Sequence, residues 1–185
     1  SEYAELDEKM DVVQGKLVMA YRLGAPEGET EQAAARMMAA LYGGTPFSKL
    51  FMNVREKMSL CYYCTARYDR PTGVILVDSG VEAANMTKAE EEIGNQLSAV
   101  AEGGFTEEER GNTLLLAVNS LKSVEDSLDG AEGWYLTRIL DGDMRTPAED
   151  AETIGAVTAE QIAEMAGRAK LAAVYRLTGE EKTDA

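Results

Sequence analysis

The sequence predicts an α+β fold, a two-layer sandwich in which helices pack on one face of a mostly antiparallel sheet. Apolar residues alternate over 16–23, which indicates a first strand. Two further apolar runs flank a turn at 69–73 and predict an antiparallel hairpin. Three or four helical segments then precede a closing strand over 171–177. With 185 residues, 45% of them apolar, the chain can bury one substantial core.

The domain organisation follows from composition along the chain. Residues 1–13 are polar and acidic and predict a linker or lead-in, residues 14–178 form the domain, and 179–185 form a charged tail. The chain begins without Met, so we expect a fragment excised from a longer protein. Its start also lacks the apolar centre of a signal peptide. No run approaches the roughly 20 apolar residues that span a bilayer.

The first half of the chain predicts two helices before the hairpin. An alanine-rich helix over 30–42 ends at Gly43-Gly44. Thr45 is then expected to cap a second, short helix, with Pro46 at its first position. One side of this helix is apolar and should face the core; its residues are Phe47, Leu50, Phe51, Val54 and Met58.

The hairpin is predicted from a strand over 60–68 and the unbroken apolar run 74–77, which is typical of a strand buried on both faces. The helices that follow are indicated by apolar spacing and by capping boxes at Thr106 and Thr158. Their marker residues are Ala89, Ile93, Leu97 and Val100; Leu114, Val118, Leu121 and Val124; and Trp134, Tyr135, Ile139 and Leu140.

Net charge is −15 and the chain contains no histidine. Such an acidic chain disfavours nucleic acid and anionic membranes, because both are bound through clusters of Lys and Arg. The charge could instead recruit basic peptides, but we interpret it mainly as a source of solubility.

Cys61 and Cys64 form a Cys-x-x-Cys spacing. Redox and metal motifs place this spacing at a helix N-terminus or a tight knuckle. Here both residues fall in the predicted strand, where an offset of three points side chains to opposite faces. We therefore interpret them as two unrelated, reduced core thiols, which suits a reducing cytoplasm.

The sequence lacks the residues that several kinds of catalysis need. No serine or cysteine nucleophile has a histidine base, and Gly43-Gly44 lacks the Lys-Ser/Thr of a phosphate loop. Asp141-Gly142-Asp143 is interpreted as a loop after a helix rather than a cation site. The glutamates at 90–92 and 107–109 are interpreted as solvated helix faces. We predict no catalytic residue and no metal ligand in this chain.

Arg55 and Tyr62 are the remaining candidates for a site, one on the short helix and one on the following strand. A guanidinium fork and a phenol can together hold peptide carbonyls or an oxyanion. Alternatively, the arginine pairs with a nearby acid and the tyrosine is half-buried in the sheet. The residues alone leave both interpretations open.

The motif around this pair supplies a resemblance. The wording Gly-Gly…Ser-Lys-Leu-Phe…Val-Arg-Glu-Lys…Ser-Leu-Cys-Tyr-Tyr resembles the C-terminal half of the pitrilysin/insulin-degrading-enzyme (insulinase, inverzincin) family of zinc metallopeptidases. Ser59 stands where that family usually has Gly, and Cys61 where it often has Ala. The sequence of this motif most resembles that of bacterial paralogues that lack the full zinc motif.

The resemblance implies a peptidase-like domain that is inactive by itself and forms one half of a clamshell. The family's zinc is held by a His-x-x-Glu-His helix, so zinc is expected in a partner half and no cofactor in this domain. Arg55 and Tyr62 would then bind and orient a peptide substrate for proteolysis. The implied partners are peptide and a catalytic half or paralogous subunit, and the isolated fragment could form a homodimer. The alternative is a structural scaffold domain of a catalytically dead family member.

Overall fold

The sheet of the protein has five strands in the computed structural model, which describes residues 3–140 and 142–179. Their spatial order is β1-β5-β2-β4-β3, and β1 runs parallel to β5 while the other neighbours are antiparallel. The mostly antiparallel sheet predicted from the sequence is confirmed. The strands are β1 (Ala4–Met10), β2 (Gly15–Arg22), β3 (Tyr63–Asp69), β4 (Val74–Val81) and β5 (Lys170–Gly179).

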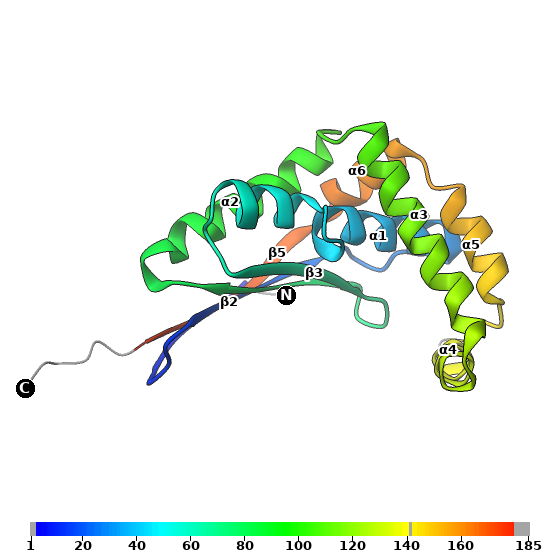
Figure 1. Ribbon diagram of the computed structural model, residues 1–185, viewed down its shortest axis with the longest axis horizontal. Coiled ribbons are helices and arrows are strands. Elements are labelled where there is room, and N and C mark those ends of the chain that lie inside the picture. The colour runs from blue at the N-terminus through cyan, green and yellow to red at the C-terminus, as the bar shows by residue number, and fades with distance from the viewer. Residues whose placement is uncertain (1–2, 141, 180–185) are drawn as a thin grey trace, which may run out of the picture.

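The helices over 28–39, 86–101 and 159–168 lie on one side of this sheet, and the helix over 128–140 lies past its edge, as Figure 1 shows. Helix α6 contacts both α1 and α2 above the strands, and α3 and α5 pack on each other and on α1. This arrangement confirms the α+β prediction. The α-helices are α1 (Gly28–Ala39), α2 (Met86–Ala101), α3 (Glu107–Ser123), α4 (Leu128–Leu140), α5 (Pro147–Gly155) and α6 (Ala159–Arg168). Short π- and 3₁₀-helices are η1 (Ala40–Gly44), η2 (Leu50–Lys57), η3 (Ala83–Asn85) and η4 (Val124–Asp126).

The core lies between the helices and the sheet. The strand register aligns Met19, Val77, Val174 and Ala66 in one row across four strands, and all four are buried. The predicted stripe of α2, which includes Ile93, packs into the same cluster. Removing this apolar surface from water is the main stabilising contribution to the fold.

The predicted lead-in contains strand β1, so that prediction was wrong for residues 4–10. The strand was missed because every residue in it is exposed, and an edge strand without a buried face shows no apolar alternation. Side chains of β5 hold it in place. Tyr175 donates a hydrogen bond to Glu8 at 2.6 Å, and Arg176 pairs with Glu5 at 2.5 Å and Asp7 at 3.2 Å.

The second helix begins later than predicted. Thr45 does not cap it, because its buried hydroxyl has no hydrogen-bond partner among the described residues. Ser48 accepts from the Phe51 N–H at 3.4 Å instead. A turn therefore separates η1 from η2. The chain comes close to the sheet at Gly43, where an added Cβ would lie 2.6 Å from Ala66.

Three other elements differ from the prediction. Strand β3 begins at Tyr63 rather than near residue 60, and β4 continues to Val81. Within β4, Ile75 and Val77 are buried but their neighbours are only half-buried, so the strand has one buried face rather than two. Helix α5 was missed, although Thr146 and Glu149 form a capping box at its start. The predicted tail over 179–185 lies outside the described residues except for Gly179.

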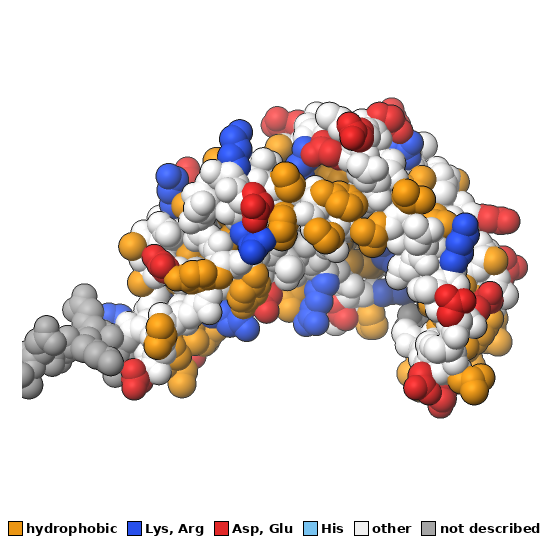
Figure 2. All heavy atoms as spheres, in the orientation of Figure 1, with side chains coloured by type: hydrophobic (Ala, Val, Ile, Leu, Met, Phe, Trp, Pro, Cys, Tyr) orange, Lys and Arg blue, Asp and Glu red, His pale blue; other side chains and the backbone are white. Residues whose placement is uncertain are grey.

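The acidic charge of the chain is spread over the surface. Figure 2 shows Asp and Glu side chains distributed over the visible face, with Lys and Arg between them. In the part of the chain that the structure describes, no helix has both the length and the apolar character of a membrane span.

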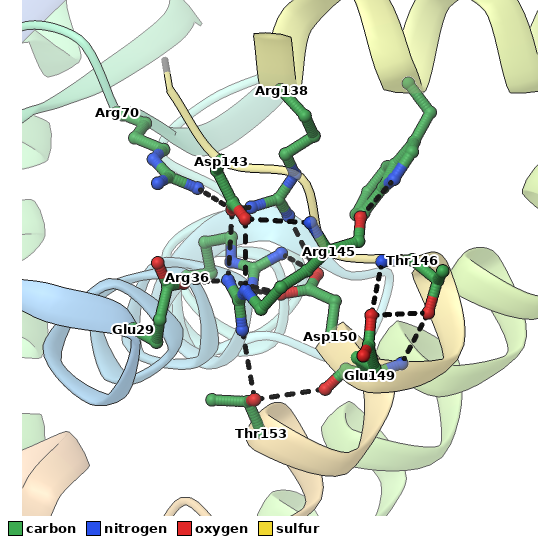
Figure 3. A network of polar contacts seen from close by, with 11 residues as sticks. Glu29, Arg36, Arg70, Arg138, Asp143, Arg145, Thr146, Glu149, Asp150 and Thr153 are labelled. Carbon is green, nitrogen blue, oxygen red and sulfur yellow. Dashed lines mark hydrogen bonds and ion pairs between the residues drawn. The ribbon is translucent and has the colours of Figure 1, made fainter.

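A network of arginines and carboxylates ties the helical layer together (Figure 3). Asp150 on α5 is fully buried, and Arg36 on α1 donates two hydrogen bonds to it at 2.6 and 2.7 Å. Arg138 on α4 donates a third at 3.0 Å. Arg138 also pairs with Asp143, which accepts from Arg70 of the β3–β4 turn at 3.3 Å. Four separate segments are therefore joined through two carboxylates.

These contacts explain the ionisation of both acids. Burial by itself would raise the pKa of Asp150, but hydrogen bonds and charge from Arg36, with Arg138, lower it below its ordinary value. Burial would also raise the pKa of Asp143, but the hydrogen bonds from the Arg145 N–H and from Arg138 lower it below its ordinary value. Asp143 lies in a loop after a helix, as predicted, while Asp141 is outside the described residues.

Replacing Asp150 by Ala should lower the free energy of unfolding by about 3–5 kcal/mol, because it leaves buried guanidinium groups without their carboxylate. Urea unfolding followed by circular dichroism and by the fluorescence of Trp134, the single tryptophan, measures this loss. Trp134 stacks 4.2 Å from the Arg138 guanidinium and so reports on the network directly. The control is Glu152→Ala, an exposed change on the same helix, which should stay within about 0.5 kcal/mol. A loss under about 1 kcal/mol in Asp150→Ala would contradict the role given to the network.

Stability should also fall in acid through these two groups. A carboxyl whose folded pKa is below its unfolded value of about 3.9 gives its full stabilisation above that value. The stabilisation is lost as pH falls through the lowered folded pKa. Urea midpoints measured down through this range should fall more steeply for the wild type than for Asp150→Ala. Parallel curves for the two proteins would show that the contribution of Asp150 does not titrate as described.

Candidate functional site

Arg55 is positioned by the packing of η2 on the core. Leu50 and Val54 are fully buried, and they fix the side of η2 that faces the sheet. The Arg55 side chain lies at the edge of that buried side, 37% exposed, with its guanidinium 4.7 Å from the centre of the Phe51 ring. Stacking on the ring supports the guanidinium while leaving its edge open to other groups.

A tight reversal at Ser59 returns the chain toward the sheet. Ser59 has a φ of 52°, in the left-handed region that favours glycine. Its N–H donates to the Arg55 carbonyl at 3.1 Å, and the Leu60 N–H donates to the Val54 carbonyl at 3.0 Å. These bonds satisfy carbonyls at the end of η2, as left-handed helix C-caps commonly do. The position where the resembled family usually has Gly therefore has the backbone conformation that glycine prefers.

Tyr62 is held at three points just before β3, rather than within it as predicted. Its N–H donates to the Gly80 carbonyl at 2.9 Å, which extends the pairing with β4 by one bond. Its carbonyl accepts from Arg55 Nε at 2.7 Å. Its hydroxyl donates to Glu82 Oε1 at 2.5 Å. The arginine and the tyrosine are thus directly joined through the tyrosine backbone.

The two predicted residues line one open groove of about 400 Å³. The Tyr62 side chain is half exposed, so the phenol is accessible to solvent. The geometry places them together as the sequence interpretation required. The groove is lined by Arg55, Glu56, Ser59, Leu60, Cys61, Tyr62, Glu82 and Asn85.

The groove combines one guanidinium with two carboxylates. Arg55 Nη1 donates to Glu56 at 2.8 Å, so the alternative of an arginine paired with a nearby acid is also realised. The hydrogen bonds to Glu56 and to the Tyr62 carbonyl use Nη1 and Nε of Arg55. A guanidinium carries five N–H donors in total, so donors remain for another group. The hydrogen bond to Glu82 raises the pKa of Tyr62. The phenol is therefore protonated at neutral pH and able to donate to a carbonyl oxygen.

Sequence reasoning did not single out Glu82 and Asn85. Both follow β4, whose end at Asp78-Ser79-Gly80 looks like a turn in the sequence. The pairing of Tyr62 with Gly80 brings them beside the tyrosine. Only the register of the β3–β4 hairpin could have indicated this, and the register depends on where β3 begins.

The interpretation of the two cysteines needs correction. Cys61 lies before β3 and lines the groove, whereas Cys64 is buried on the core side of the strand. Cys61 therefore lies outside the strand, so the alternation of β3 does not fix its side chain relative to Cys64. Both are free thiols, as expected; Cys64 is buried in the core, whereas Cys61 is only partly buried.

The zinc implied by the family resemblance does not fit this chain. The groove offers two carboxylates and no imidazole, and the described residues contain no group of three or more His, Cys, Asp or Glu side chains that could hold a metal ion. A metal-dependent step cannot be assigned to these residues.

A larger hollow of about 890 Å³ lies on the helix side of the sheet, between α2, α6 and β5. Its lining includes Met19 and Tyr21, and its charged groups are Arg176 and the glutamates Glu90, Glu91 and Glu102. Arg176 is held by Glu90 through two hydrogen bonds at 2.6 and 2.8 Å, in addition to its contacts with β1. This hollow lacks the pairing of an accessible guanidinium with a phenol, so we do not treat it as the site.

The conformation of Ser59 gives a test of the reversal that places Tyr62. Ser59→Gly should raise the free energy of unfolding by about 0.5–1 kcal/mol, because glycine reaches a positive φ without the Cβ penalty. Ser59→Ala is the matched control, since it keeps the Cβ and should give no gain. Urea unfolding of both variants makes the comparison. Equal stabilities would argue against a left-handed backbone at this position.

Comparison with known proteins assigns this chain to a family. The family described as the peptidase M16 inactive domain matches residues 4–112. The chain is 33% identical over 178 residues to a protein of Bacillus subtilis (strain 168) named "Probable inactive metalloprotease YmfF", covering 96% of this chain and 42% of that protein. The chain therefore spans less than half the length of this curated relative.

Solved structures share the fold. A conserved protein from Enterococcus faecalis V583 matches with a TM-score of 0.90 at 32% identity, over 98% of this chain and 43% of that one. The inactive peptidase domain of a putative zinc protease from Bordetella parapertussis matches with a TM-score of 0.74 at 12% identity, over 88% and 93% of the two chains. From the family match over residues 4–112, this chain belongs to the peptidase M16 family, as a domain of its inactive type.

Proposed function

We propose that this chain is the peptide-binding, non-catalytic half of an M16 clamshell, in which another domain or subunit supplies the zinc site. The observation that carries the proposal is the meeting of Arg55 and Tyr62 in one solvent-open groove. The relative lengths support a companion half, since the chain covers 42% and 43% of two of its relatives.

In this proposal the groove holds a peptide by its backbone. Arg55 would donate the N–H groups not engaged with Tyr62 and Glu56 to a peptide carbonyl. The Tyr62 phenol would turn from Glu82 to a second carbonyl and donate its proton there. Zinc in the companion half would polarise the scissile carbonyl and activate water. This chain would contribute orientation of the substrate.

Glu56 and Glu82 bear on which peptides would fit. Both carboxylates lie beside the two donor residues, so they would favour a peptide with basic side chains near the bound carbonyls. The net charge of −15 would act in the same direction at long range.

The second candidate function is a scaffold domain without peptide binding. It is favoured by the relative named as a probable inactive metalloprotease, because 96% of this chain is similar to part of that protein. The contacts of Arg55 with Glu56 and of Tyr62 with Glu82 would then serve only to stabilise the loop before β3.

Arg55→Ala and Tyr62→Phe should each weaken peptide binding about tenfold, or ~1.4 kcal/mol, since each removes hydrogen-bond donors to the peptide. The measurement is fluorescence anisotropy of fluorescein-labelled unstructured basic peptides, with the full-length protein that contains this chain. Hydrolysis of the same peptides with the zinc-bearing half present should fall in parallel.

Matched controls separate binding from folding. Arg67→Ala changes an exposed arginine on β3, and Tyr175→Phe breaks a phenol–carboxylate bond on β5. Both should bind peptide like the wild type, and circular dichroism should show all four variants folded. Unchanged binding in folded Arg55→Ala and Tyr62→Phe would reject the peptide role and favour the scaffold.

A further inference from the structure

A cavity of about 430 Å³ lies in the helical layer, between α1, α4 and the β3–β4 turn. Three arginines form its polar wall, one from each of these segments: Arg36, Arg70 and Arg138. Its volume falls within the roughly 300–1,000 Å³ of small-molecule sites. Among the described residues that line it, none is acidic. The rest of the wall is mostly apolar and includes Pro71, Val124 and Trp134.

The carboxylates that bind these arginines do not line the cavity. Asp150 is fully buried, and Arg36 Nη1 and Nη2 donate to its two oxygens at 2.6 and 2.7 Å. Arg138 donates from Nη2 to Asp150 at 3.0 Å and from Nη1 to Asp143, whose side chain is 6% exposed. A ligand in the cavity would therefore meet guanidinium groups without contacting either of these carboxylates.

Arg36 and Arg138 keep hydrogen-bond donors beyond those that the two carboxylates use. A guanidinium carries five N–H donors. Each of these arginines directs two of them to carboxylates of the described residues. One of the others, on Arg36 Nε, is buried and has no hydrogen-bond partner in the part of the chain that the structure describes. Because buried donors in native structures are rarely without an acceptor, this wall is suited to an anion.

We propose that this cavity binds a monocarboxylate with an apolar body, such as an aromatic or aliphatic acid. Guanidinium groups bind carboxylates strongly, because the hydrogen bonds are charge-assisted and the planar fork matches both oxygens. The contact of Arg36 with Asp150 shows this two-pronged geometry in the same wall. Trp134, Pro71 and Val124 would contact the hydrocarbon part of the ligand and remove it from water.

The inference goes beyond the peptide proposal, since the cavity shares no lining residue with the Arg55/Tyr62 groove among the described residues. Two sources could supply the same chemistry: a free acid, or the C-terminal carboxylate of a peptide whose last side chain is apolar. Either ligand would contact α1, α4 and the β3–β4 turn together. Binding would therefore stabilise the helical layer.

Isothermal titration calorimetry tests the proposal, with 3-phenylpropionate as the probe and the full-length protein that contains this chain. We expect saturable binding at one site. The neutral 3-phenylpropionamide should bind about tenfold more weakly, because it cannot form charge-assisted hydrogen bonds. A tripeptide ending in phenylalanine, with a free or an amidated C-terminus, tests the second source. Tighter binding of the free tripeptide than of 3-phenylpropionate would assign the peptide source, and the reverse order would assign the free acid.

Gly133→Leu tests the location of the ligand. Gly133 lines the cavity, and a Cβ added there meets no atom within 4 Å, so a leucine side chain can occupy the space without displacing α4. Leucine also favours a helix more than glycine does, and circular dichroism checks that the variant is folded. Binding of 3-phenylpropionate should be lost. The matched control is Gly111→Leu on α3, where an added Cβ also meets no atom within 4 Å, and it should bind like the wild type.

The fluorescence of Trp134 locates the ligand without an occluding variant. Its emission, taken as the difference between the wild type and Trp134→Phe, should change with the dissociation constant that calorimetry gives, because Trp134 lines the cavity. No binding by the wild type, equal affinity for the acid and the amide, or tighter binding of inorganic phosphate would overturn the proposal. Unchanged binding in folded Gly133→Leu, or unchanged Trp134 emission, would also overturn it.

Discussion

The hydrogen bond from Arg55 Nε to the Tyr62 carbonyl, at 2.7 Å, is the contact on which the site depends. It joins the end of η2 to the start of β3, two segments that a reversal at Ser59 brings back to each other. A charged donor makes this bond stronger than a neutral one. Because this bond uses the tyrosine backbone, the phenol is left to face the groove. The position of the phenol also depends on the hydrogen bond from the Tyr62 N–H to the Gly80 carbonyl near the end of β4.

The rest of the fold holds these two segments rigid. Leu50 and Val54 bury one side of η2, and the close approach at Gly43 brings the preceding segment against β3. The arginine–carboxylate network around Asp150 acts elsewhere, between α1, α4, α5 and the β3–β4 turn. The groove is therefore a feature of the sheet end, while the network secures the helical layer above and beside the sheet.

The sequence predicted most of the elements that have a buried face, although α5 was missed, and it singled out Arg55 and Tyr62, which the structure places in one groove. Alternation identified β2, and apolar spacing identified α2, because burial imposes those periods. Strand β1 has no buried face and was missed. The partners of the site, Glu82 and Cys61, were missed or misread because they depend on where β3 begins. That boundary is set by the Arg55 contact, which no local pattern reveals.

In the proposed function, peptide occupies the groove between η2 and the ends of β3 and β4. Hydrogen–deuterium exchange of the full-length protein, with and without saturating basic peptide, tests it most directly. Peptide bound in the groove should slow exchange only at residues 55–62 and 80–85. Slower exchange only around the hollow between α2, α6 and β5, with 55–62 unchanged, would contradict it.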